Sequence, residues 1–175
     1  AEKEKVPASV VSSHFWLAVI SSETGKPEEA ARHITQARNV SESSNLSAGA
    51  KSANEISLGL LESDLLSTKK DFAAARKQLE QTKALIDKRG IAVEVMSYQT
   101  SAGYLDMIQG NYDKALEMFQ KGSPENPLNI YRTAMAYEKK GDKANAKKWY
   151  QAVVNWNWTG FSYAIARPQA LKKIK

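Results

Sequence analysis

Residues 101–151 read SAGYLDMIQGNYDKALEMFQKGSPENPLNIYRTAMAYEKKGDKANAKKWYQ and contain one pattern twice. Each copy predicts a helix, a tight turn at a glycine and a second helix. A small residue of the first helix precedes a small residue of the second by twelve positions, and an aromatic residue follows four positions later. The two sets are Gly103, Ala115 and Phe119, then Ala134, Ala146 and Tyr150. Small residues let two helices approach closely, and the aromatic side chain one turn later fills the space between pairs.

The same spacing continues toward the N-terminus in a weaker form. The corresponding positions are taken by Ala18, Ala30 and Ile34, then by Ser63, Ala75 and Leu79. Aliphatic residues thus replace the aromatic ones in the first half of the chain. We therefore expect four helix pairs, with turns near residues 25, 70, 110 and 141.

Helix ends follow from the glycines, prolines and capping residues between the apolar stripes. Either Asn45 or Ser47 is expected to cap the third helix. The eight expected helices span 8–23, 27–40, 46–68, 72–88, 91–109, 112–121, 128–140 and 143–155. We expect residues 160–174 to form a terminal capping helix, weakened near Pro168, and residues 1–7 to form a flexible leader.

This spacing resembles the tetratricopeptide repeat family, whose repeats of roughly 34 residues combine a large residue, Leu-Gly, an aromatic, Ala, an aromatic and Pro. The residues that carry the resemblance are Gly103, Gly110, Tyr112, Ala115, Phe119, Pro127, Ala134, Tyr137, Gly141, Ala146 and Tyr150. The resemblance is to a bacterial type with degenerate repeats. It implies an all-α, right-handed helical solenoid of about four antiparallel helix pairs, forming a single domain over residues 1–175.

Composition agrees with a helical globular chain. Hydrophobic residues make up 42% and charged residues 25%, and Ala, Leu, Lys, Glu and Gln fill most segments. The absence of cysteine excludes a disulfide scaffold and thiolate sites. No apolar run approaches the roughly 20 residues of a membrane-spanning helix. Because the chain begins Ala-Glu-Lys, we expect an exported or periplasmic bacterial protein, with a cytoplasmic one as the alternative.

The net charge of +6 suits an anionic partner. The charges are spread along the chain, however, so we interpret them as a lysine-rich solvated surface. Basic residues gather at 69–89 and at 139–148, the second group near Trp149, Trp156 and Trp158. Mixed basic and aromatic residues can hold single strands, which leaves a basic nucleic-acid-binding repeat protein as the alternative function. Interspersed acidic residues such as Glu80 and Asp142 make nucleic acid the less favoured partner.

No residue pattern indicates catalysis. His14 and His33 are the only histidines, and neither belongs to a nucleophile–base arrangement or to a set of three or four zinc ligands. We interpret His14 as a packing or groove residue. No glycine-rich loop precedes a helix as in a nucleotide site. We therefore expect a protein that is not an enzyme and that uses no metal and no cofactor.

The resemblance implies that the first helix of each pair lines a concave groove. Among the residues placed there, we expect a partner to contact Phe15, Trp16, Tyr104, Tyr131, Arg132 and Met135. Only Arg132 matches the charged positions of the family's peptide clamp, so apolar and aromatic walls suited to an amphipathic helix or an extended peptide remain. We expect a protein-interaction or scaffold module. The alternative is that these residues are buried between helices, and homo-oligomerisation stays open.

Overall fold

The computed structural model describes residues 2–157 and 159–174, with side chains from Val6 onward. Within these residues every regular element is an α-helix and no strand is present. The chain divides into two compact units, residues 1–91 (unit 1) and residues 92–175 (unit 2). The expected all-α fold of helix pairs is therefore confirmed. A single continuous domain over 1–175 stays a prediction.

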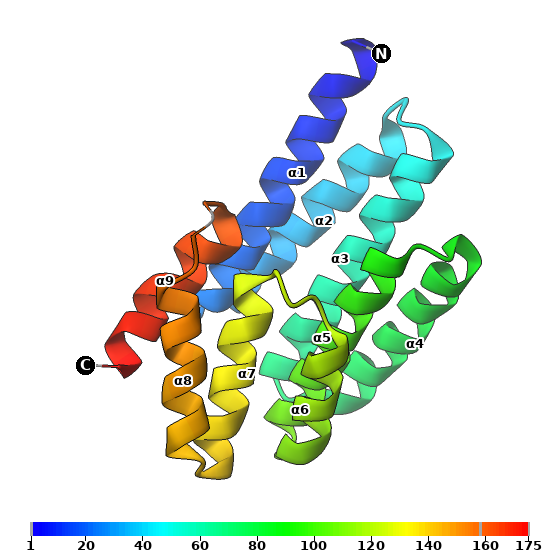
Figure 1. The fold of residues 1–175 in the computed structure, drawn as a ribbon. Coiled ribbons are helices and arrows are strands. Elements are labelled where there is room, and N and C mark those ends of the chain that lie inside the picture. Colours follow the sequence, from blue (N-terminus) through cyan, green and yellow to red (C-terminus); the bar gives the residue numbers. More distant parts are fainter. Residues whose placement is uncertain (1, 158, 175) are drawn as a thin grey trace. The chain divides into compact units, whose positions relative to one another are not determined.

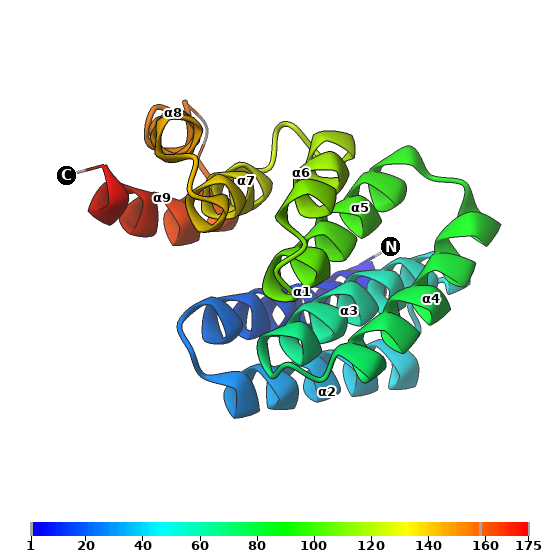
Figure 2. The same cartoon turned by 90° about the horizontal axis from the view of Figure 1, so that it is seen from below.

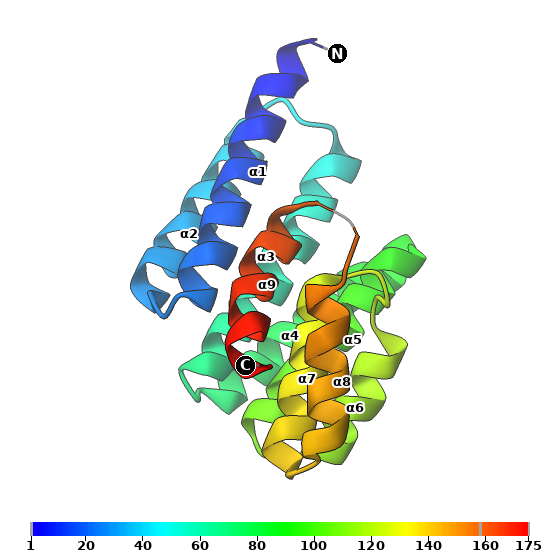
Figure 3. The ribbon, with the colours of Figure 1, turned by 60° about the vertical axis from the view of Figure 1, so that its left-hand side comes forward.

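Unit 1 contains two antiparallel helix pairs (Figure 1). The first pair is α1 (Glu2–Glu23) and α2 (Pro27–Ser43), and the second is α3 (Ala48–Thr68) and α4 (Phe72–Arg89). Figure 3 shows α1 and α2 side by side along most of their length. Because α3 packs against both α2 and α1, the first helices of the two pairs are neighbours.

Unit 2 contains two shorter pairs and a terminal helix. These are α5 (Ala92–Ile108) with α6 (Tyr112–Lys121), α7 (Pro127–Lys140) with α8 (Lys143–Val154), and α9 (Phe161–Lys173). The terminal helix packs against both α8 and α7, as Figure 2 shows where α8 is seen nearly end-on. It buries Ala166 and Ala170 completely, which is the covering role expected of a capping helix.

The small residues predicted at the helix crossings are buried in all four pairs. Seven of the eight are Ala18, Ala30, Ser63, Ala75, Ala115 and Ala134 at 0% exposure and Ala146 at 4%. The eighth is Gly103, which is also buried. The residues four positions further, Ile34, Leu79, Phe119 and Tyr150, are buried as well. The twelve-and-four spacing therefore marks real helix contacts in both units, because it places one small and one large side chain on the same buried face.

The turns within the four pairs share one backbone geometry. Each has a residue in the left-handed region, namely Gly25, Lys70, Gly110 or Gly141. In the last turn, for example, the Gly141 N–H donates to the Glu138 carbonyl and the Asp142 N–H to the Tyr137 carbonyl. The other three turns repeat this pair of hydrogen bonds. This is the Schellman motif, which satisfies carbonyls at a helix end and reverses the chain tightly.

Helix boundaries follow the expectations closely, and Ser47 rather than Asn45 caps α3 by accepting from the Ala50 N–H at 3.2 Å. The N-terminus differs, because α1 begins at Glu2 and residues 2–7 are helical instead of forming the expected flexible leader. Ala1 lies outside the described residues. The difference has a local reason, since Glu and Lys are good helix formers and Pro7 removes only one hydrogen bond near the helix start.

Each unit also contains ion pairs that connect different helices. In unit 1, Arg38 of α2 contacts Glu55 at 3.0 Å and Glu62 at 2.9 Å, both on α3. Burial alone would lower the pKa of Arg38, but the hydrogen bonds and charges of the two glutamates raise it above its usual value. These ion pairs therefore connect one helix pair to the next, although the partial exposure of the side chains limits their contribution to stability.

In unit 2, the corresponding ion pair involves Glu138 near the end of α7. The Glu138 carboxylate accepts from Lys173 of α9 at 2.9 Å and from the Tyr150 hydroxyl of α8 at 2.8 Å. Burial alone would raise the pKa of Glu138, but these two partners hold it below its usual range. Burial and the bond to Glu138 raise the pKa of Tyr150. One carboxylate thus joins all three C-terminal helices.

Candidate functional site

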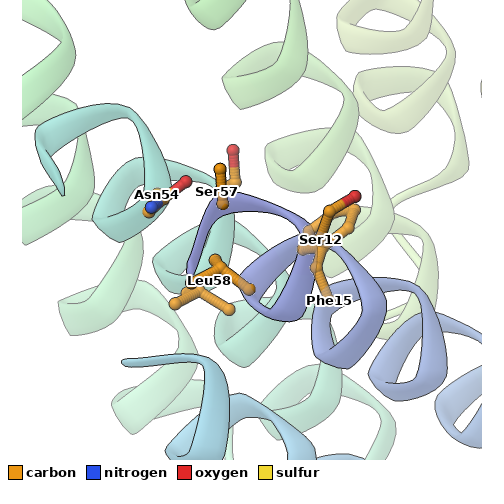
Figure 4. A pocket seen from close by; sticks show the side chains of 7 residues that line it. Ser12, Phe15, Asn54, Ser57 and Leu58 are labelled. Atoms are coloured by element: carbon orange, nitrogen blue, oxygen red, sulfur yellow. The ribbon is translucent and has the colours of Figure 1, made fainter. Parts of the chain in front are cut away.

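A pocket of about 160 Å³ lies between α1 and α3 in unit 1 (Figure 4). Its lining residues are Ala8, Val11, Ser12, Phe15, Asn54, Ser57 and Leu58. Val11 and Leu58 are buried at 4% and 1% exposure, so the deeper wall is apolar. Ser12 and Ser57 are exposed and provide hydroxyls at the rim. No lining side chain carries a charge, so the pocket suits an uncharged apolar group.

Helix periodicity places these side chains together. On α1, Val11 and Phe15 are four residues apart and therefore lie on one face. On α3, Asn54 and Leu58 have the same separation, and the Asn54 amide donates to Ser41 Oγ of α2 at 3.0 Å. That bond orients the amide, so one polar wall of the pocket is preorganised.

Of the two predicted contact residues in unit 1, one lines the pocket. Phe15 is half-buried there, and its ring meets Trp16 edge-on with centroids 5.2 Å apart. Trp16 is also half-buried, but it is not among the lining residues. Trp16 therefore supports the Phe15 ring from the side.

In unit 2, the structure brings Tyr104 and Arg132 together. The guanidinium carbon of Arg132 lies 4.0 Å from the centre of the Tyr104 ring. Arg132 is only 7% exposed, whereas Tyr104 is half-buried. The pair joins α5 to α7 by a cation–π contact, which is stronger where water is excluded. Tyr104 is therefore the more exposed member of the pair.

Tyr131 and Met135 are the other two predicted contact residues of unit 2, and both pack inside that unit. The Tyr131 side chain is 5% exposed, and its hydroxyl donates to Gln169 Oε1 of α9 at 3.2 Å. Met135 is half-buried against the core cluster that includes Met107 and Phe119. Contact of these residues with a partner, and a single groove running through both units, stay predictions.

The two histidines face each other across the first helix pair. Their Nδ1 atoms are 3.0 Å apart and their ring centroids 5.2 Å. Among the described residues, no group of three or more histidine, aspartate or glutamate side chains could hold a metal ion. The two side chains therefore form a hydrogen bond that connects α1 and α2 in this structure.

Apart from Phe15, the residues that line the pocket are not among the contact residues that the sequence predicts. They include Asn54 and Leu58, both on α3. The available signal was their four-residue spacing, which puts both on the α3 face that also carries Ser57.

Comparison with known proteins agrees with the helix-pair geometry. A family model described as tetratricopeptide repeat matches residues 130–157, which cover most of α7 and all of α8. No curated protein matches the chain. Within the described residues, no helix is long and apolar enough to cross a membrane.

Among solved structures, the chain is similar to nearly identical TPR-like repeats from Podosopora anserina, described as kinesin light chain. The match has a TM-score of 0.50 and 16% identity, and covers 95% of this chain and 87% of that one. A variant of the same repeats gives a TM-score of 0.49 at 16% identity, with the same coverage.

Repeats of this family generally mediate protein–protein interaction, and the fold is typically non-catalytic. The first likeness supports the fold of the whole chain, and the family match supports the last helix pair in sequence. The chain is thus built of helix pairs similar in fold to tetratricopeptide repeats, and residues 130–157 match the tetratricopeptide repeat model in sequence.

Proposed function

We propose that this chain is a non-enzymatic protein-interaction module, and that unit 1 holds an apolar side chain of a partner peptide or helix between α1 and α3. The observation that carries this proposal is the uncharged pocket lined by Phe15. It lies on the first helices of two successive pairs, the face that repeats of this kind use for partners.

The chemistry of the pocket narrows the kind of partner. A buried apolar wall favours an aliphatic or aromatic side chain, because transferring apolar surface from water is favourable. The rim hydroxyls of Ser12 and Ser57 and the amide of Asn54 can pair with partner backbone groups. A charged anchor would lose its hydration without gaining an ion pair there. The partner segment therefore presents an uncharged apolar anchor flanked by polar backbone.

The test begins with selection of binding peptides from a randomised display library, followed by affinity measurement on purified variants. Ser57→Arg fills the rim with a long cation while leaving the core intact, because Ser57 is exposed. We expect the affinity to fall by about tenfold or more. Ser13→Arg is the matched control, since Ser13 is also exposed, on α1, but does not line the pocket.

Selected peptides should share an uncharged apolar anchor residue. Equal binding by Ser57→Arg and Ser13→Arg would place the binding site elsewhere on the chain. Tyr104→Ala tests whether unit 2 takes part as well, because Tyr104 exposes more of its side chain than its neighbour Arg132 does. Unchanged affinity in a folded Tyr104→Ala protein would confine the partner to unit 1.

A further inference from the structure

The positive charge of the chain is concentrated at its C-terminal end. Residues 143–175 contain seven lysines and arginines and no aspartate or glutamate. The remaining 18 basic residues, from a total of 25, are balanced by all 19 acidic residues in the first 142 positions. The net charge of +6 therefore belongs to α8 and α9 and to the residues around them. This corrects the interpretation of an evenly spread charge.

The structure places three of these lysines on the outer side of α8. Lys143, Lys147 and Lys148, here called the α8 lysine face, are exposed, whereas Ala146 and Tyr150 of the same helix are buried, and α8 packs against α7. In the described part of the chain, no carboxylate lies within ion-pair distance of any of the three. The charge of this face is consequently compensated only by solvent and salt.

Aromatic residues follow beyond the C-terminal end of α8. Trp156 is half-buried in the connection after α8, and Phe161, the first residue of α9, is 55% exposed. Figure 1 shows the α7–α8 turn and this connection at opposite ends of α8. At 1.5 Å per residue, the two ends are roughly 17 Å apart. A surface that contacts both the lysines and these aromatic residues would therefore extend along α8.

We propose that the α8 lysine face, together with Phe161, binds the surface of an anionic phospholipid membrane. Lysine is a compact point charge that suits diffuse negative charge, while the forked contacts that arginine makes with individual phosphates are lacking on this face. Lysine clusters on helices attract anionic lipid headgroups, and aromatic side chains favour the membrane–water interface. An acidic peptide would need the lysines but would give no role to the exposed Phe161 ring.

The expected strength follows from the number of charges. A lysine near an anionic membrane surface contributes about fivefold to the partition coefficient, so removing three should weaken binding by roughly 100-fold. The effect should also shrink as salt is added, because exposed charges are screened within about 10 Å at 0.1 M ionic strength. Loss of Phe161 should weaken binding by a smaller factor, because one exposed ring inserts only part of its surface.

The experiment is co-sedimentation of the full chain with vesicles of phosphatidylcholine alone or mixed with phosphatidylserine. We expect binding only to the mixed vesicles. The triple variant Lys143→Gln, Lys147→Gln, Lys148→Gln should lose it, and Phe161→Ser should reduce it. The matched control neutralises Arg32, Lys77 and Lys88, three exposed cations of unit 1, and should bind like the unmodified chain.

Circular dichroism of each variant checks that the helices remain, which is expected because all substituted side chains are exposed. Equal loss in the control triple variant would mean that only total charge matters, and would overturn the assignment to α8. Failure to bind mixed vesicles, with binding instead to a single-stranded oligonucleotide or to a glutamate-rich peptide that depends on the same lysines, would also overturn the lipid assignment.

Discussion

The contact between α3 and α4 in unit 1 and the contact between α5 and α6 in unit 2 occupy the same place in the repeat but use different residues. In unit 1, Ser63 is fully buried, and its hydroxyl donates to the Ala75 carbonyl at 3.1 Å. In unit 2, the equivalent residue is Gly103. A Cβ built on Gly103 would lie 2.8 Å from the Phe119 ring and 3.1 Å from the Ala115 carbonyl.

The difference is explained by the residue that fills the space one turn later. Leu79 takes that position in unit 1 and Phe119 takes it in unit 2, and both are buried. A larger ring leaves no room for a side chain at residue 103, whereas leucine leaves room for a serine hydroxyl. Protein interiors are close-packed, so the combined size of the two residues is constrained more tightly than either identity.

The largest expected effect is the removal of the filling side chain. Phe119→Ala should lower the free energy of unfolding by about 4 kcal/mol, and Leu79→Ala by about 3 kcal/mol, because each leaves a cavity. Urea denaturation followed by circular dichroism measures both. Phe161→Ala, at an exposed ring, is the control and should stay within about 0.5 kcal/mol. A Phe119→Ala loss as small as that of the control would show that the crossing in unit 2 is not close-packed.

A double-mutant cycle tests the size compensation directly. Gly103→Ser should cost about 2 kcal/mol on its own, because the new side chain meets the Phe119 ring. Combining it with Phe119→Leu recreates the residue pair of unit 1. The double variant should then lose at least about 0.5 kcal/mol less than the sum of the single variants. If the free-energy changes of the two single variants were strictly additive, residues 103 and 119 would be energetically independent. Size compensation would then not explain why unit 1 and unit 2 use different residues.

The turns offer a smaller test of the same kind, because unit 1 has Lys70 at φ 62° where unit 2 has Gly141 at φ 89°. A Cβ is unfavourable in the left-handed region. Lys70→Gly should therefore raise the free energy of unfolding by roughly 0.5–1 kcal/mol, and Gly141→Ala should lower it by about 1 kcal/mol. Thermal unfolding of both variants shows whether each substitution raises or lowers the free energy of unfolding. If Lys70→Gly lowered the free energy of unfolding instead, the lysine side chain would stabilise the fold by more than the strained backbone destabilises it.

The smallest expected effect concerns Glu138 and occurs only in acid. Its pKa is lower in the folded chain than in the unfolded one, where it is about 4.3. Its contribution to stability is thus complete above that value and is lost as the pH falls through the folded pKa. Below about pH 4.3, Glu138→Gln should lose less free energy of unfolding than the unmodified chain does. The difference should be a few tenths of a kcal/mol, because the carboxylate is partly exposed. The unfolding midpoint measured as a function of pH checks this. Identical acid profiles for the two proteins would contradict this.

The sequence by itself determined the helices, the turns and the crossings. The cap of α3 is an exception, because the sequence left Asn45 and Ser47 as alternatives and the structure selects Ser47. The left-handed turn positions depend on residues adjacent in the chain, and the twelve-and-four spacing joins two consecutive helices across one short turn. Both can therefore be located without reference to any more distant segment. This is why the bounds of α6 agree with the expectation at both ends. The uneven charge was also present in the sequence, as the lack of acidic residues beyond Asp142.

Only the tertiary structure decided which of the predicted contact residues remain open. Phe15 and Tyr131 both lie on first helices of a pair, yet Phe15 lines a pocket between α1 and α3, whereas Tyr131 is buried and bonded to Gln169 of α9. The physical reason is that helix periodicity fixes which face a residue occupies. Whether that face meets solvent or another helix depends on the packing of segments distant in sequence.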